Sequence, residues 1–340
     1  MALWTDLITP AEATGYLRAS MEDAEARKGS LAEFLPNDLK NDTVLRLRVD
    51  EHGLVDEARF RAYDAEPAIG RTRRGRSMTM EMPALSQTLI VTELEQLRAL
   101  GASEDAMRTE IEKRIRQAGQ AIAARMVRMR GQVLETGKAV IDQDDYQATA
   151  DFGRAAELNL TAPTLWSDPS ADRLGFLEAI HDAYVDANGE EPGSLLLTTA
   201  ALRALARGTQ VATVLPGGAT RPARTSEAIT LIQDAGFENV VINDRRTSGG
   251  RVISDNVVIA LPAPVSPDSP EESALGATFW GRTLTAQESE YQLPVADMPG
   301  AVCGVYRNEK PPHGKEVFAD AIGMPALANA NLSVKGVINS

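Results

Sequence analysis

Three groups of residues have types and spacing that could support chemistry, and each departs from the pattern that its chemistry requires. Gly131, Gly137 and Lys138 approach a phosphate-binding loop, but five residues separate the glycines where that motif has four. Ala139 also follows the lysine, where the motif needs a hydroxyl residue. The glycines end an expected helix, whereas a phosphate loop begins one. We therefore expect no nucleotide site here.

An acidic run provides the second group. Asp142, Asp144 and Asp145 approach the start of a calcium-binding loop. Tyr146 and Gln147, however, stand where a third oxygen ligand and a glycine belong. A polar turn between two strands is the better interpretation, and we expect no metal ion and no other cofactor.

The histidines and the cysteine form the third group. His52, His181 and His313 lack the HExxH spacing of a zinc protease, and no GxSxG serine is present for a catalytic triad. Cys303 is the only cysteine, which excludes an internal disulfide and a multi-cysteine zinc site. We predict no catalytic residues and interpret each histidine as a surface or core residue.

Arginines and methionines instead predict a contact between subunits. Residues 44–49, 58–62 and 76–82 alternate with period two, as strands do, and together they form a long hairpin without an apolar core of its own. The arginines could hold phosphate, but Asp64 and Glu66 lie close in sequence. A contact between subunits explains the arginines equally well. Methionine side chains suit an adaptable interface. The predicted contact residues are Arg59, Arg61, Arg71, Arg73, Arg74, Arg76, Met78, Met80 and Met82.

Composition limits the class of protein. The 340 residues are 43% hydrophobic and 24% charged, which is typical of a globular chain and excludes a disordered one. The net charge of −13 excludes nucleic-acid binding by a bulk surplus of cations. No signal-peptide pattern and no apolar stretch of about 18 residues is present, so we predict no membrane partner.

A long helix must organise the chain. Residues 104–136 carry an apolar stripe and end at Gly137, and four-residue Glu/Arg pairs support the opposite face. The 33 residues predict a helix about 50 Å long. Because Gly119 and Gly131 interrupt the pattern, we favour a spine that packs on a sheet over a coiled coil. The stripe is formed by Met107, Ile111, Ile115, Ala118, Ile122, Met126, Met129 and Val133.

The rest of the chain predicts an arm and a mixed lobe. Thr9, Pro10 and Glu12 predict a capped helix at about 10–27, within an arm that has little apolar material and needs a surface to lie on. Helical and strand segments then alternate over residues 173–261, which is typical of a mixed α/β lobe. The extended parts of such a chain favour a subunit of an assembly.

Several segments also resemble a known family. These are RAYDAEPAIG at 61–70, ETGK at 135–138, DFGR at 151–154, LWSD at 165–168 and DAYVDANGEEPG at 182–193. In order and over most of the chain, they are similar to the lambda-type tailed-phage major capsid proteins, the E family. The resemblance implies an α+β fold of the Hong Kong-97 type. It implies an N-terminal arm at 1–43, an E-loop at 44–90, a P-domain at 91–160, an A-domain at 161–290, and return strands of the P-domain with a C-terminal A-domain strand at 291–340.

The same resemblance implies a function and partners. The chain is expected to be a coat protein without enzymatic activity, which assembles with itself into the pentamers and hexamers of an icosahedral shell around double-stranded DNA. Assembly in the host bacterial cytoplasm, non-specific contact with the packaged DNA, and portal, separate scaffold and decoration proteins as partners are implied as well. Two alternatives remain from the residues alone: a cytoplasmic α/β enzyme that uses the mixed lobe, and an elongated helical scaffolding protein that uses the long helix as a coiled coil.

Overall fold

The computed structural model describes residues 2–49, 76–99, 104–143, 146–214, 221–311 and 313–339. The chain opens with a short strand, a helix and a second short strand. These are β1 (Ala2–Leu3), α1 (Pro10–Glu25) and β2 (Asn37–Leu39). The predicted cap of α1 is confirmed as a capping box, in which the Glu12 amide donates to Thr9 Oγ1 at 3.3 Å and Glu12 Oε2 accepts from the Thr9 amide at 3.0 Å.

A hairpin and a second helix follow the arm. They comprise β3 (Val44–Val49), β4 (Arg76–Glu81), β5 (Ala84–Val91) and α2 (Glu93–Ala99). Strands β3 and β4 pair antiparallel, with Val44 opposite Glu81, and form a two-stranded sheet of their own. The expected strand at 58–62 lies outside the described residues.

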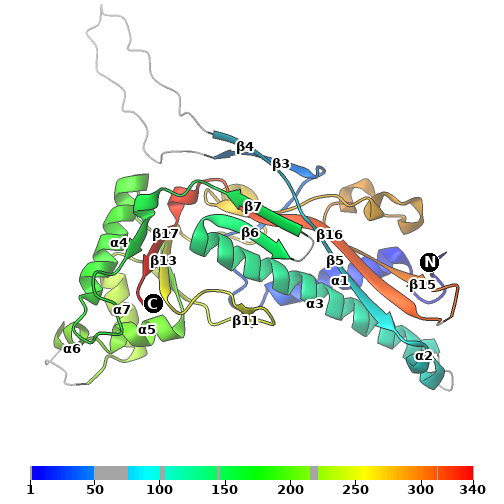
Figure 1. Ribbon diagram of the computed structural model, residues 1–340, viewed down its shortest axis with the longest axis horizontal. Helices are drawn as coiled ribbons and strands as arrows, with labels where there is room; N and C mark the ends of the chain where they lie inside the picture. Colours follow the sequence, from blue (N-terminus) through cyan, green and yellow to red (C-terminus); the bar gives the residue numbers. More distant parts are fainter. Residues whose placement is uncertain are drawn as a thin grey trace, which may run out of the picture.

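The spine helix α3 (Glu104–Thr136) has the predicted length of 33 residues and ends at Gly137, whose φ of +68° suits glycine. Ile111, Ile115 and Val133 on the predicted stripe are fully buried. The helix packs against α1, β5 and the later strand β16 (Lys315–Leu327) of its own chain, as Figure 1 shows. A spine that lies on a sheet is therefore confirmed, and the coiled-coil alternative is wrong.

One mixed sheet lies beneath the spine. Its order is β1-β15-β16-β14-β2, with β5 also paired to β16. The further strands are β14 (Gly276–Trp280) and β15 (Val302–Arg307). Strand β14 lies within the segment expected to form the A-domain, yet it pairs with β16 and, in parallel, with β2. The six-stranded sheet thus takes a strand from that segment, because Gly276 to Trp280 stand in register with Leu327 to Gly323.

A second sheet forms the mixed lobe that the sequence predicts. Its order is β10-β9-β13-β17-β8, and Figure 1 shows it at the end of the molecule opposite α2. Its strands are β8 (Asn159–Thr161), β9 (Ser194–Leu197), β10 (Asn239–Ile242), β13 (Val257–Leu261) and β17 (Val334–Val337). The accompanying helices are α4 (Arg173–Asn188), α5 (Thr199–Ala206), α6 (Thr209–Val214) and α7 (Thr225–Asp234). Two small hairpins complete the fold, β6 (Lys138–Gln143) with β7 (Tyr146–Asp151) and β11 (Arg246–Thr247) with β12 (Gly250–Arg251).

The arm lies on its own chain. Leu17 of α1, Ile115 of α3 and Val317 of β16 belong to one buried cluster, and Gly119 lets the backbone of α1 approach the spine closely. The expectation that the arm has little apolar material is wrong, because Phe34 and Leu35 are also buried. Among the described residues, no helix is long and apolar enough to cross a membrane.

Candidate functional site

The methionine face of the β3–β4 hairpin is partly covered by the chain itself. Met82 is only 6% exposed and belongs to the same core cluster as Phe279 and Met324. Its amide donates to the Thr43 carbonyl at 2.9 Å, which closes the base of the hairpin. The hairpin therefore shares the core of the chain at its base, a contact that the alternating sequence could not reveal.

Farther from the base, Met78 and Met80 are half-buried and pack against that cluster from its edge. Arg76 is the first residue of β4 and stands opposite Val49. The predicted contact residues Arg59, Arg61, Arg71, Arg73 and Arg74 lie outside the described residues. The structure thus places Met78 and Met80 on β4 and Met82 directly after it, and leaves the first two partly accessible.

A buried arginine joins the arm to the spine. Arg130 of α3 is 0% exposed, and its Nη2 lies 2.8 Å from Glu25 Oε1. Its Nε donates to Thr278 Oγ1 at 2.7 Å, and its two terminal nitrogens donate to the Ser30 carbonyl at 3.2 Å and to Asn37 Oδ1 at 2.7 Å. Burial lowers the pKa of Arg130, and the neighbouring Glu25 carboxylate opposes that shift. Sequence reasoning missed this residue; an arginine directly beside the apolar stripe was the available signal.

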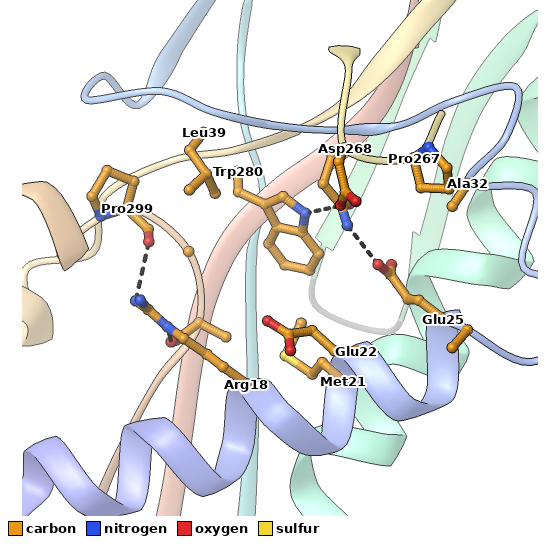
Figure 2. A pocket seen from close by; sticks show the side chains of 14 residues that line it. Arg18, Met21, Glu22, Glu25, Ala32, Leu39, Pro267, Asp268, Trp280 and Pro299 are labelled. Carbon is orange, nitrogen blue, oxygen red and sulfur yellow. Dashed lines mark hydrogen bonds between the residues drawn. The ribbon is translucent and has the colours of Figure 1, made fainter. Parts of the chain in front are cut away.

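A cavity of about 610 Å³ lies beside this network, between α1 and the strands β2 and β14. Figure 2 shows Trp280 and Glu25 on its walls, and the Trp280 Nε1 donates to Asn37 Oδ1 at 2.8 Å. Farther along the same helix as Glu25, Arg18 donates to the carbonyls of Pro299 and Ala301 at 3.1 and 2.9 Å. These polar groups hold the arm and neighbouring loops together. The described residues that line the cavity include no histidine, cysteine or serine, and their ionisable side chains are Arg18, Glu22, Glu25 and Asp268.

The remaining candidates for chemistry lie apart and have structural contacts. Lys138 pairs with Asp151 at 2.6 Å, and a Cβ at Gly131 would lie 2.1 Å from the Val252 carbonyl oxygen, so that glycine serves close packing. Cys303 is fully buried, and burial raises the pKa of its thiol to about 12.

The acidic turn and the histidines are equally separate. Gln147 donates to Asp142 Oδ1 at 2.9 Å across the β6–β7 hairpin, while Asp144 and Asp145 lie outside the described residues, as does His52. His181 packs edge-on against Phe237, far along the chain from His313. Within the described ranges, no group of three or more histidine, cysteine or acidic side chains could hold a metal ion.

Three of the sequence segments that carry the family resemblance have clear structural roles, while RAYDAEPAIG at 61–70 lies outside the described residues. Arg154 of DFGR donates to the carbonyls of Leu134 and Glu135 at 2.5 and 3.1 Å, which caps the end of the spine helix, and burial lowers its pKa to about 10. Gly189 of DAYVDANGEEPG ends α4 in the left-handed conformation, with φ of 75°. Trp166 of LWSD is 2% exposed in the core of the mixed lobe. These three motifs therefore support the fold.

Comparison with solved structures finds the same fold in capsid proteins. A capsid protein of an Escherichia coli CFT073 prophage superposes with a TM-score of 0.60 at 14% identity, covering 96% of this chain and 98% of that one. A phage-related protein from Bordetella bronchiseptica RB50 gives a TM-score of 0.56 at 16% identity, covering 94% and 95%. An encapsulin from Synechococcus elongatus PCC 7942 gives 0.50 at 10% identity, covering 92% and 88%. The architecture is accordingly the Hong Kong-97 type α+β fold that the resemblance implies.

Sequence comparison gives the family itself. A search of curated proteins finds no match. The model of the family described as phage major capsid protein E, however, matches residues 31–263, which is more than half of the chain. Proteins of this family build the shell of the phage particle. The chain belongs to the phage major capsid protein E family, and it is a structural protein of the capsid shell rather than an enzyme.

Proposed function

We propose that this capsid protein assembles into pentamers and hexamers of an icosahedral shell that encloses the double-stranded DNA of a tailed phage, and that the β3–β4 hairpin contacts the neighbouring subunit. The observation that carries the proposal is the pairing of this hairpin. Within the described residues, β3 and β4 pair only with each other, and a two-stranded sheet in water is marginally stable by itself. Contact with a second subunit would cover the part of the hairpin that the first subunit leaves exposed.

The outer part of the methionine face supports this contact. Met78 and Met80 are half-buried within one subunit, so each keeps apolar surface that a partner could cover. Met82, in contrast, is buried in the core of its own chain. Arg59, Arg61, Arg71, Arg73, Arg74 and Arg76 are proposed to form bidentate ion pairs with the neighbouring subunit. The relevant variant is therefore Met78→Ser with Met80→Ser, leaving Met82 unchanged.

Negative-stain electron microscopy of the purified protein tests both parts. The wild-type chain should form shells or rings, and the Met78→Ser/Met80→Ser variant should remain folded by circular dichroism but fail to assemble. The matched control is Met78→Leu/Met80→Leu, which keeps the apolar area and should assemble. Normal shells from the serine variant would show that the hairpin is not an interface, and a lack of particles from the wild-type chain would contradict the assembly itself.

We also propose the division of the chain into an arm, an E-loop, a P-domain and an A-domain at the limits 1–43, 44–90, 91–160, 161–290 and 291–340, with two adjustments. The pairing of β5 with β16 supports assigning 84–90 to the P-domain sheet, and the pairing of β14 supports assigning 276–280 there. The pairing of β17 with β13 supports the return of the C-terminus to the A-domain.

Further partners follow from the same proposal. The portal, a separate scaffold and decoration proteins would contact the shell during or after assembly in the host cytoplasm. Contact with the packaged DNA would be non-specific, and the net charge of −13 supports weak adhesion of a polyanion.

A further inference from the structure

The helix α2 lies at one end of the molecule (Figure 1) and carries exposed apolar side chains. Leu94 and Leu97 are 56% and 57% exposed, and Ile90, at the end of the preceding strand, is 53% exposed. Exposed apolar side chains are common singly, but a group of large ones on one short segment indicates a surface that a partner covers.

The opposite face of α2 fixes the helix in place. Glu95 lies 2.9 Å from Arg114 of the spine and accepts hydrogen bonds from the amide and hydroxyl of Thr92. The Gln96 side chain donates to the carbonyls of Val91 and His313 at 3.2 and 2.7 Å. Because these bonds set the rotation of the helix, the outward direction of the two leucines is built into the fold.

The outward face has a regular charge pattern. Glu93, Leu94, Leu97 and Arg98 are all exposed, and their spacing places them on one stripe of the helix, with an acid at one end and a base at the other. Neither Glu93 nor Arg98 has an ion-pair partner within the described residues. When two copies of this stripe pack antiparallel, Glu93 of each meets Arg98 of the other and the leucines meet between them. A parallel arrangement would oppose like charges.

We propose that this stripe, Glu93-Leu94-Leu97-Arg98, is a contact between two copies of the chain related by a two-fold axis, with their α2 helices antiparallel. A two-fold interface requires a surface that is complementary to itself, and the stripe has this property. The inference rests on the proposed self-assembly and assigns to it a second contact, at the end of β5 opposite to the β3–β4 hairpin (Figure 1). Ile90 extends the apolar centre of this contact toward the sheet.

Charge reversal tests the pairing. Glu93→Arg places arginine opposite Arg98, and Arg98→Glu places glutamate opposite Glu93, so each variant alone should raise the protein concentration needed for assembly by about tenfold at low salt. A mixture of the two variants restores opposite charges across every mixed contact, and the double variant Glu93→Arg/Arg98→Glu restores them within one chain. Both should assemble close to the wild-type level, as measured by light scattering and electron microscopy.

The matched control is Glu178→Arg, which makes the same change of charge at an exposed position of α4 and should assemble normally. Circular dichroism checks that each variant is folded. If the wild-type chain forms shells and the single variants assemble equally well, the α2 contact is wrong. The contact is also wrong if the mixture assembles no more readily than each variant alone. In both cases the proposed function stands. A wild-type chain that forms no shell overturns the proposed function and the contact with it.

Discussion

Arg130 and Glu25 form an ion pair inside the subunit, with Nη2 of the arginine 2.8 Å from Oε1 of the glutamate. The pair joins the C-terminal part of the spine helix to the last turn of the arm helix. Asn37 takes part from β2, because it accepts from Arg130 and donates to Glu25. The position of the arm thus depends on one buried charge of the spine.

Glu25→Ala should destabilise the folded subunit by about 3–5 kcal/mol, because it leaves the Arg130 guanidinium buried without its carboxylate. Urea unfolding followed by circular dichroism measures the loss. Glu22→Ala removes an exposed carboxylate from the same helix and should change the free energy of unfolding by no more than about 0.5 kcal/mol. Equal losses from the two variants would contradict the role of the pair.

Two glycines in helices should respond oppositely to alanine. In Gly131→Ala the new Cβ would lie 2.1 Å from the Val252 carbonyl oxygen, so the spine must shift, at a cost of about 1–3 kcal/mol. In Gly15→Ala the new Cβ meets nothing within 4 Å, and the better helix propensity should stabilise the protein by about 0.5–1 kcal/mol. Thermal unfolding of the two variants gives the sign directly, and a stabilised Gly131→Ala would disprove the close contact.

Glu227 should titrate well below an ordinary glutamate. Its oxygens lie 2.7 and 2.9 Å from the Arg221 guanidinium, and the Arg224 amide donates to it, which lowers its pKa from 4.5 to about 2. Because the folded pKa is lowered, the stabilising contribution is present above pH 4.5 and disappears as the pH falls toward 2. Carboxyl chemical shifts measured by NMR should show this titration, and Arg221→Ala should raise the pKa. The exposed Arg207→Ala is the control and should leave it unchanged.

Mature shells should contain no lysine-mediated covalent links through the E-loop. Some proteins of this fold join a loop lysine to an asparagine of the next subunit, but all seven lysines here lie outside residues 44–90. Arginine cannot replace lysine, because its guanidinium stays protonated. Particles boiled in detergent should therefore run as one band near 36.5 kDa, beside a chemically cross-linked sample that gives a ladder. A ladder without cross-linker would refute this prediction.

Local patterns predicted the spine helix, its buried stripe, the cap of α1 and the strands of the mixed lobe, because periodicity and capping residues act over a few positions. The long strand β16 was missed because Gly323 and Pro325 interrupt its sequence. Among the described residues, β15 flanks β16 only as far as Asp320 and β5 only as far as Ile322, and the stretch around Pro325 pairs with β14 alone. The missing proline amide is therefore tolerated there.

The contacts of the arm and of Arg130 could not be predicted in the same way. They join residues about 100 or more positions apart, such as Arg130 with Ser30 and with Thr278, and no short-range pattern contains such a pairing. Likewise, the alternation of Met78, Met80 and Met82 indicates one common face, whereas only the folded chain determines that Met82 enters the core. Sequence patterns identified the face, and tertiary packing determined how much of it stays accessible.

The direct connection of β4 to β5 has a mechanical consequence. Strand β5 follows the hairpin after Pro83 and pairs antiparallel with β16 from Ala84 opposite Ile322 to Val91 opposite Lys315. A neighbour that pulls on the hairpin therefore applies force along β5. The load acts parallel to the strands, so all the ladder hydrogen bonds resist sliding together instead of opening one after another. If the hairpin contacts a neighbour as proposed, tension from that neighbour therefore passes through β5 into β16 of the six-stranded sheet.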